Sequence, residues 1–385
     1  MTHYDYIIAG GGSAGLGLAF AIARSPLKDK RVLVVDLDNK KKNDRTWCSW
    51  VQGATPFDEI AYTSWPKIRF VGGGRDLVIP IEPYRYQMVR GIDFYDFTKR
   101  VVAQEGNADF LQARVESVNE DDNAAFITTD EGSFSADYVF DSLFLPKDFV
   151  VDETRYHFLK QHFLGWEIKT EKPVFDTSVA TLFDFRTPQH GEMRFVYVLP
   201  FAEDRGLVEF TLFSHDLLTQ EEYTRCLTDY IDEVLRPGPY TIVDSEDGII
   251  PMTDKPFPRA GGNRIMYTGT KGGRVKASTG FAFHRTQADS RAIVQSLVHH
   301  GHPFLLPKPA PRYGLFDSML LQLLYRRGEL SERIFTDMFV KNPIDRLFRF
   351  LDEEAGVGEN IKLMASVPWG PFIQSYFRIR VLGKI

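Results

Sequence analysis

The sequence predicts a mixed α/β fold in which a parallel βαβ unit comes first, antiparallel strands follow, and helices end the chain. Two apolar runs, Tyr6–Ala9 and Arg31–Asp36, flank a glycine-rich turn and a helical stretch at Leu16–Arg24, which is the order of a βαβ unit. Later segments alternate apolar and polar residues around short turns, as antiparallel hairpins do. After four prolines between Pro303 and Pro311, apolar residues return at helical spacing.

Composition narrows the class of protein. The 385 residues carry 46 basic and 52 acidic side chains, a net charge of −6, with 43% hydrophobic residues; this is an ordinary globular balance, which disfavours disorder and a nucleic-acid-binding role. At this length two or more structural units are expected. The 31 phenylalanines favour handling of something large and apolar. Cys48 and Cys226 have no paired spacing, so a disulfide framework and a cysteine zinc site are excluded, no metal is expected, and a reducing cytoplasm fits.

No segment is predicted to cross a membrane. The apolar N-terminal stretch contains five glycines between Gly10 and Gly17 and lacks a basic start, so it is not typical of a signal peptide. No other stretch approaches the roughly 20 apolar residues that a spanning helix needs. We expect a soluble or peripheral protein.

The antiparallel strands are predicted from their alternation. Three hairpin regions are expected, and the last is apolar at nearly every position, which indicates a place inside the protein. Their strands are Lys67–Val71 with Leu77–Ile81; Phe110–Val118, Ala124–Thr129 and Ser133–Phe140; and Arg194–Leu199 with Leu207–Ser214.

The glycine-rich turn carries a dinucleotide-binding pattern. Gly10, Gly12 and Gly15 form GxGxxG between a strand and a helix, and Asp36 ends the next strand 26 residues after Gly10. Glycines allow close approach of a pyrophosphate to the helix N-terminus, Ser13 and Ala14 of the turn are included among the cofactor-binding candidates, and the aspartate can accept the ribose hydroxyls. The pattern predicts a Rossmann-type domain and leaves FAD and NAD both open.

Two later segments resemble motifs of the glutathione-reductase-like flavoproteins related to p-hydroxybenzoate hydroxylase. Met88–Asp93 resembles their Val-x-Arg segment, which implies that Arg90 lies beside the cofactor. Ile265–Thr270 and the following Thr279 and Gly280 resemble their third flavin motif, which implies that Gly269, Thr270, Thr279 and Gly280 hold FAD. In this chain Thr270 replaces the usual aspartate, and its hydroxyl can still bond a sugar alcohol.

Six further segments resemble bacterial lycopene β-cyclases in order and approximate spacing, and the resemblance extends to about residue 290. They are Arg45–Trp50, Gln161–Glu167, Arg194–Pro200, Leu207–Thr211, Glu246–Pro251 and Ser278–Phe281. The resemblance implies cyclisation of the linear ends of lycopene to β-ionone rings, giving β-carotene with or without a γ-carotene stage. It also implies reduced FAD as the active cofactor, NAD(P)H as the reductant and no net redox change.

Glu209 is the first candidate for the acid that such a cyclisation needs. Alternation along Leu207–Phe213 places Glu209 and Thr211 on one face of an apolar strand. Burial there would raise the pKa of the carboxyl and keep it protonated at neutral pH. A salt-bridged or edge-strand glutamate is the alternative, and the resemblance favours the catalytic role because Glu209 matches the family's essential acidic position. Reduced flavin is a rival acid.

Three other carboxylates are second-rank candidates. Glu246 and Asp247 precede Gly248 and an apolar run, a pattern that also fits an exposed turn, and the resemblance brings them forward. Glu167, like Asp184, lies among aromatic residues and could equally bind an arginine.

These observations give a domain plan and a location. Residues 1–150 and 260–305 form a discontinuous FAD-binding domain, 151–259 an antiparallel substrate-binding sheet domain and 306–385 a helical C-terminal region. Because lycopene dissolves in the bilayer, the resemblance implies a cytoplasmic protein on the inner face of the cell membrane. Leu315–Leu324, with Arg326 and Arg327 nearby, could form the docking face or could pack on the flavin domain.

Two other functions stay open at this point. One is a flavin-dependent prenyl reductase or monooxygenase, which would consume nicotinamide or oxygen stoichiometrically. The other is a prenyl-binding carrier of related fold without flavin chemistry.

Overall fold

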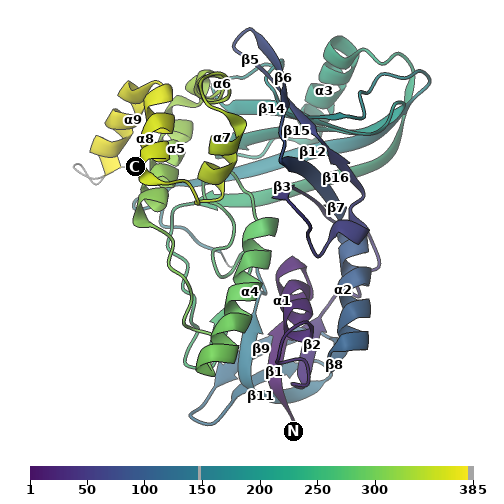
Figure 1. Cartoon of the computed structure of the whole chain (residues 1–385), viewed down its shortest axis with the longest axis vertical. Coiled ribbons are helices and arrows are strands. Elements are labelled where there is room, and N and C mark those ends of the chain that lie inside the picture. Colours follow the sequence, from purple (N-terminus) through teal and green to yellow (C-terminus); the bar gives the residue numbers. More distant parts are fainter. Residues whose placement is uncertain (146–148, 380–385) are drawn as a thin grey trace.

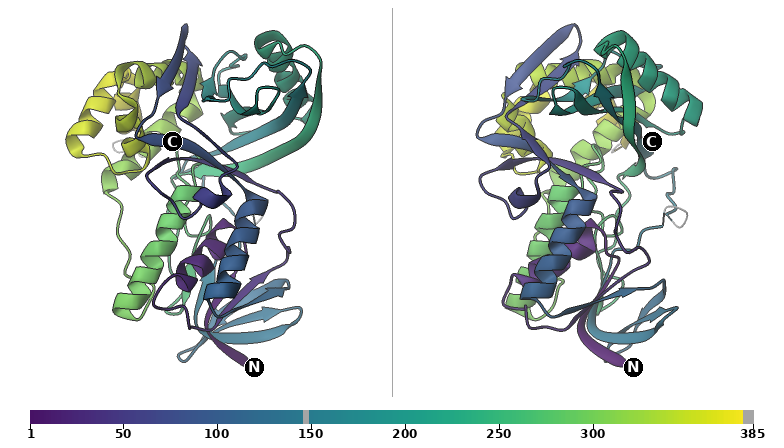
Figure 2. Two further views of the ribbon diagram at one scale, coloured as in Figure 1. Left: turned by 45° about the vertical axis from the view of Figure 1, so that its right-hand side comes forward. Right: turned by 90° about the vertical axis from the view of Figure 1, so that its right-hand side faces the viewer.

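The computed structural model describes residues 1–145 and 149–379 and has two main sheets, one at each end of the molecule (Figure 1). The first sheet, near the N-terminus, is covered by helices α1, α2 and α4, and the second lies beside the C-terminal helices. Figure 2 shows the same division from two other sides. The predicted fold class is confirmed.

The first sheet begins with the predicted βαβ unit. Helix α1 connects strands β1 and β2, which pair in parallel. Strand β11 pairs in parallel with the other edge of β1. The sheet order is β8-β2-β1-β11-β10-β9, and β17 also pairs with β11. Its strands are β1 (Thr2–Ala9), β2 (Val32–Asp36), β8 (Ala108–Gln112), β9 (Val115–Glu120), β10 (Ala125–Thr129), β11 (Gly132–Asp141) and β17 (Ile265–Tyr267).

Helices α1 (Ser13–Ala23), α2 (Gly91–Glu105) and α4 (Phe283–His300) cover one face of this sheet. Their apolar side chains join those of β1 and β2 in one buried cluster. One sequence prediction is corrected here, and one helix was missed. The segment Phe110–Val118 is not one hairpin strand, because β8 pairs parallel with β2 and only β9 continues into the antiparallel hairpins. Helix α2 was not predicted, although its buried residues recur at helical spacing.

The second sheet is mainly antiparallel and has the order β16-β12-β15-β14-β13-β5-β6. It contains two of the three predicted hairpin regions, β5 with β6 and β14 with β15. Its strands are β5 (Lys67–Gly72), β6 (Arg75–Pro80), β12 (Phe158–Thr170), β13 (Val179–Asp184), β14 (Met193–Ala202), β15 (Arg205–Ser214) and β16 (Tyr240–Thr253). Because β5 and β6 belong to it, the chain enters this sheet well before residue 150; the domain limits stay a prediction.

Smaller elements complete this half. A three-stranded sheet has the order β3-β7-β4, with β3 (Thr46–Gln52), β4 (Thr63–Trp65) and β7 (Tyr84–Arg90). Helix α3 (Gln220–Tyr230) and a π-helical turn, Ile231–Leu235, pack on the face of the second sheet that carries Val208, Phe210 and Leu212. Short 3₁₀ turns occur at Asp58–Ile60 and Gly328–Leu330.

The C-terminal helices cover the opposite face of the second sheet. Leu321, Leu324 and Phe348 share a buried cluster with Leu207 and Phe213 of β15. The structure favours neither alternative offered for the stripe on α5, because its leucines are core residues that pack on the second sheet and against the neighbouring C-terminal helices. The helices are α5 (Pro311–Arg327), α6 (Ser331–Lys341), α7 (Ile344–Leu351), α8 (Val357–Ser366) and α9 (Trp369–Phe377). Residues 380–385 of the predicted helical region lie outside the described residues.

No helix within residues 1–145 and 149–379 combines the length and the apolar character needed to cross a bilayer.

Candidate functional site

A cleft of about 630 Å³ runs between the first and second sheets. One end is lined by the glycine-rich turn and the end of β2, and the other by β12, β14, β15 and β16. The loop between β17 and α4 forms a wall between these ends. The cleft therefore brings together segments from the beginning, middle and later part of the chain.

The glycine-rich turn forms an open cradle at the N-terminus of α1. Gly10 has a φ of +104°, which favours glycine, and a Cβ on Gly15 would lie 1.7 Å from the Gly10 carbonyl oxygen. Gly15 thus lets the helix pack on the turn. Gly12 is different, because a Cβ there would meet nothing within 4 Å and Gly12 lines the cleft. The space that a side chain would fill is where a pyrophosphate would need to approach the helix.

The other predicted cradle residues support the same reading. Ser13 and Ala14 are the first residues of α1 and line the cleft. The carboxyl of Asp36, at the end of β2, also lines it and accepts hydrogen bonds from the Gly11 amide at 2.5 Å and the Asp38 amide at 2.7 Å. Its position fits a ribose, with Lys40 Nζ 3.8 Å from it.

The wall of the cleft presents side-chain polar atoms that have no hydrogen-bond partner among the described residues. The Thr279 hydroxyl and the side-chain amide oxygen Oε1 of Gln161 are buried and unpaired within the described residues, and both residues line the cleft. Gly269 and Gly280 have φ values of +57° and +72°, and a Cβ on Gly280 would lie 2.1 Å from the Gln161 oxygen. Buried unpaired polar groups are uncommon because each costs free energy.

A polyhydroxylated ligand would satisfy these atoms. Thr270 and Gly269 lie along the same wall. The cradle, the aspartate and these unpaired groups therefore fit the phosphate, ribose and sugar-alcohol parts of a flavin dinucleotide.

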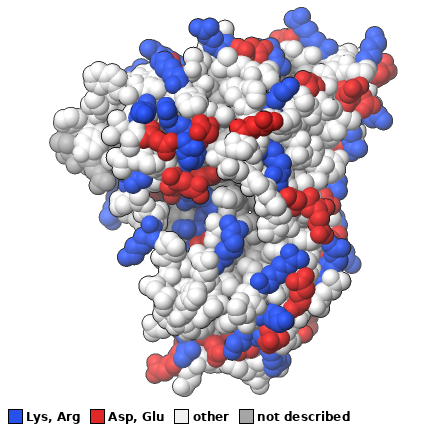
Figure 3. All heavy atoms as spheres, in the orientation of Figure 1, with Lys and Arg blue, Asp and Glu red and all other residues white. Residues whose placement is uncertain are grey.

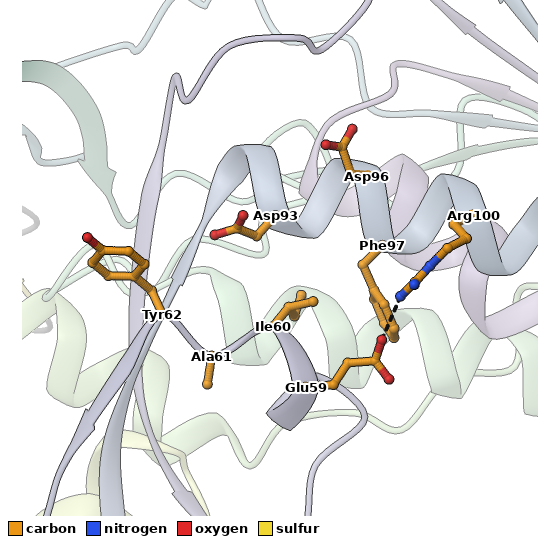
Figure 4. Close-up of a pocket in the computed structure, with 8 residues that line it drawn as sticks. All are labelled: Glu59, Ile60, Ala61, Tyr62, Asp93, Asp96, Phe97 and Arg100. Atoms are coloured by element: carbon orange, nitrogen blue, oxygen red, sulfur yellow. Dashed lines mark hydrogen bonds and ion pairs between the residues drawn. The ribbon is translucent and has the colours of Figure 1, made fainter.

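Arg90 lies elsewhere. Its guanidinium pairs with Asp93 at 2.6 Å and stacks over the Tyr62 ring at 4.2 Å, and it is not among the residues that line the cleft. Tyr62 and Asp93 border a separate, shallow hollow beside α2 (Figure 4). That hollow also contains Glu59, whose carboxylate pairs with Arg100 at 2.6 Å. Its carboxylates and open shape make it a poor place for a flavin or an apolar chain.

Glu209 and Glu246 form a carboxyl pair at the end of the cleft away from the cradle. Glu209 on β15 and Glu246 on β16 are both register partners of Gly165 on β12, the strand between them. A Cβ on Gly165 would lie 3.2 Å from Glu209 Cβ, so the glycine leaves room above β12. The two carboxyls share a hydrogen bond.

Burial raises the pKa of both carboxyls above the usual glutamate range, and it is the largest cause in each case. Repulsion from Glu246 raises the pKa of Glu209 further, while the Thr211 hydroxyl, which donates to Glu209 Oε1 at 2.8 Å, lowers it. The Thr46 hydroxyl donates to Glu246 Oε2 at 2.7 Å and lowers the pKa of Glu246. The pair therefore holds a proton more readily than free glutamates do.

The remaining predicted acids are placed differently. Asp247 lines the cleft next to Glu246 and is exposed. Glu167 does not line the cleft, and its carboxylate pairs with the guanidinium of Arg205. Asp184 is buried and bound by Arg186 and the Tyr230 hydroxyl. The structure thus brings Glu209, Glu246 and Asp247 together, and it gives Glu167 and Asp184 the arginine partners that the alternative interpretation foresaw.

An apolar cavity adjoins the carboxyl pair. Tyr197, the register partner of Glu209 on β14, lines both the cleft and this cavity, as do Thr279 and Phe281. The cavity holds about 30 Å³, so a long ligand would have to separate its side chains. Its other walls are Trp50, Leu182, Phe183, Phe213, Phe335, Met338, Phe339, Leu347, Phe348 and Leu351.

Sequence reasoning missed three residues of this site. Gly165, Thr46 and Tyr197 lie in segments already noted for their resemblance, but none was singled out. A glycine inside a long strand is itself a signal, because it often marks close approach of other groups. Thr46 is 200 residues from its partner Glu246, and no local pattern could have joined them.

Comparisons with known proteins agree with this geometry. Residues 5–377 match the model of a family described as lycopene cyclase protein. A comparison with curated protein sequences gave no match.

Several solved structures have a similar fold. A geranylgeranyl bacteriochlorophyll reductase-like protein from Thermoplasma acidophilum has a TM-score of 0.63 at 13% identity, covering 97% of this chain and 98% of its own. The flavin-dependent brominase Bmp2 has a TM-score of 0.65 at 16% identity, covering 98% and 100%. For p-nitrophenol 4-monooxygenase PnpA from Pseudomonas putida DLL-E4 the score is 0.57 at 14% identity, covering 97% and 99%. At these identities the likeness concerns the fold.

Proposed function

Since this chain belongs to the lycopene cyclase protein family, we propose that it cyclises the linear ends of lycopene to β-ionone rings without net redox change, using reduced FAD. The observation that carries the proposal is the close carboxyl pair, Glu209 with Glu246, where burial raises both pKa values, at the junction of a nucleotide-shaped cleft and an aromatic cavity. Each part of that junction meets one requirement of the reaction.

The cofactor requirement is met by the residues of the cleft. Gly10, Gly12 and the start of α1 would hold the pyrophosphate, Asp36 the adenosine ribose, and the loop with Thr270 and Thr279 the ribityl chain. When bound, reduced FAD would supply an electron-rich ring near a developing positive charge, and NAD(P)H would keep it reduced. The protein's own side chains carry out the proton transfers.

The acid requirement is met by Glu209. An isolated alkene is a very weak base, so its protonation needs a carboxylic acid that stays protonated at neutral pH and is shielded from water. The raised pKa of Glu209 provides the first condition. Its carboxyl proton is transferred to the terminal alkene, and the next double bond attacks the resulting cation to close the ring.

The base requirement is met by the same pair after proton donation. Loss of the proton leaves two neighbouring carboxylates, Glu209 and Glu246, whose mutual repulsion favours taking a proton back. Removal of a ring proton forms the ring double bond and restores the pair to its starting protonation. The product is therefore an isomer of the substrate, and no electrons are gained or lost.

The cation and chain requirements are met by the aromatic cavity. Ring faces attract a positive charge, and Tyr197 lies beside Glu209 while also bordering the cavity. The cavity is almost wholly apolar in its lining, which suits a polyene. We propose that the chain end enters between the second sheet and helices α6 and α7, whose Phe339 and Phe348 form part of the wall.

Two measurements test this function. Pigment analysis of lycopene-accumulating cells that express the chain should show cyclic carotenes; unchanged lycopene together with normally folded, flavin-loaded protein would contradict the proposal. Anaerobic turnover of pre-reduced enzyme without nicotinamide should continue for many cycles. A single turnover that leaves oxidised flavin would instead favour a reductase.

A further inference from the structure

Helices α8 and α9 expose an apolar surface near the end of the described chain. On α9, Trp369 is 67% exposed, and Ile373, Tyr376 and Phe377 follow at helical spacing on the same side. On α8, Val357 and Ile361 are 60% and 64% exposed. We call these six residues the α8–α9 face. It contrasts with the buried side of the same helices, where Leu363 and Phe372 join the core.

Basic side chains lie on or directly after the two helices of the α8–α9 face, and one exposed carboxylate, that of Glu354, lies three residues before α8. Lys362 on α8 is exposed, and Arg378 directly follows α9. The one acidic residue of the two helices, Glu359, is bound by Arg349 at 2.5 Å. In sequence, residues 357–379 carry two basic side chains and one acidic one, within a chain of net charge −6. In Figure 3 the end of the molecule where α8 and α9 lie shows mostly uncharged atoms.

The position of this face relates it to the aromatic cavity. Helix α8 packs against α6 and α7, and those two helices supply Phe335, Phe339, Leu347 and Phe348 to the cavity wall. A partner that bound α8 and α9 would therefore lie next to α6 and α7, the helices beside which an apolar chain would pass to reach Glu209.

We propose that the α8–α9 face is the surface with which the protein docks on an anionic lipid bilayer. The choice of occupant rests on the proposed function, because lycopene dissolves in bilayers, and on the charge around the face. Tryptophan and tyrosine favour the region of lipid headgroups, and exposed apolar side chains flanked by lysine and arginine are typical of helices that lie in that interface. Anionic headgroups attract the same basic residues.

Sedimentation with vesicles tests the docking separately from the chemistry. Full-length protein is mixed with carotene-free vesicles of phosphatidylcholine alone or with phosphatidylglycerol. The wild type should bind the mixed vesicles more tightly, and the double variant Trp369→Ser/Ile373→Ser should bind them at least about tenfold more weakly because apolar burial is lost. Lys362→Gln/Arg378→Gln should lose mainly the preference for phosphatidylglycerol.

A matched control comes from the edges of the second sheet. Val78 on β6 and Ile242 on β16 are 51% and 50% exposed, and Val78→Ser/Ile242→Ser should bind vesicles as the wild type does. Equal losses in the control and in the Trp369 variant would overturn the assignment of the face. So would wild-type binding by the Trp369 variant, or a lipid-free dimer that this variant dissociates, since the face would then contact a second copy.

Activity in detergent distinguishes this proposal from the proposed function. With lycopene dispersed in micelles, Trp369→Ser/Ile373→Ser should cyclise at the wild-type rate, because neither residue borders the cleft or the cavity. Absence of cyclisation by the wild type in micelles, with vesicle binding as predicted, would refute the function and leave the docking surface in place.

Discussion

Glu209 and Glu246 face each other across a single glycine, Gly165, which is the register partner of both. Two carboxyls so placed cannot both ionise readily, since each is desolvated and repels the other. Burial and this repulsion therefore raise the pKa of the pair beside an apolar cavity and favour retention of a proton. This arrangement depends on three strands that are far apart in sequence.

The space above Gly165 is the first part of this arrangement to test. A Cβ at this position would lie 3.1 Å from Leu207 Cδ1 and 3.3 Å from Glu209 Cγ. Gly165→Val should displace the Glu209 carboxyl and lower the cyclisation rate at least about tenfold, since a misplacement of about 1 Å can cost about a hundredfold in rate. Flavin absorbance should remain.

Gly314→Ala is the control for this substitution. A Cβ on Gly314, in helix α5, would meet nothing within 4 Å, so this variant should keep wild-type activity. Full cyclisation by Gly165→Val would show that the clearance above β12 has no role.

The pH dependence of activity should report the protonation of the Glu209 carboxyl. Activity requires protonated Glu209, so kcat/KM should fall as pH rises through its raised pKa. Glu246→Gln removes the like charge that raises this pKa, and the falling limb should therefore move to lower pH. Stopped assays of carotene product across a pH series measure this limb. A limb at the same pH in both proteins would mean that another group loses the proton.

The cradle at Gly12 predicts a variant that folds but loses its flavin. Gly12 has a φ of −82°, which any residue can adopt, and a Cβ there meets open space, so Gly12→Val should preserve the fold while filling the pyrophosphate position. The purified variant should be colourless with an unchanged far-ultraviolet circular dichroism spectrum. Gly15→Val should instead disturb folding, because its Cβ would collide with the Gly10 carbonyl. A full flavin spectrum in Gly12→Val would place the dinucleotide elsewhere.

Local pattern predicted the parts of the fold that depend on neighbours in sequence. The βαβ unit, the hairpin of β14 with β15 and the opposite faces of Glu209 and Phe210 follow from hydrophobic period alone. The pairing of β8 with β2 could not be read in this way, because alternation does not identify a strand's partner. The leucines of α5 were ambiguous for a similar reason, since an apolar stripe on a helix fits either a core or a membrane.

The candidate site likewise contains some residues that a local motif predicts and others that only strand pairing brings together. Gly10, Gly12 and Asp36 form a local motif and were predicted together, and the structure places them on one cleft. The carboxyl pair was predicted only as separate candidates from a resemblance. Its hydrogen bond, its raised pKa values and its glycine spacer arise from the strand order β16-β12-β15, which no segment of sequence states.

The central claim is that Glu209 supplies the proton, and the variant Glu209→Gln tests it most directly. Glutamine keeps the shape and most hydrogen bonding of the side chain and cannot act as the acid. Glu167→Gln is the matched comparison, because Glu167 lies on the adjacent strand but is bound by Arg205 outside the cleft, and it should keep most of the activity.

The measurement is the initial rate of cyclic carotene formation by flavin-loaded Glu209→Gln with pre-reduced cofactor. General acid catalysis contributes typically about 10²- to 10⁴-fold, and an alkene needs it at the upper end, so the rate should fall by at least about a thousandfold while flavin content stays at the wild-type level. A rate above about a tenth of the wild-type value, too high for a missing general acid, would contradict the account and assign the proton to the flavin or to another carboxyl.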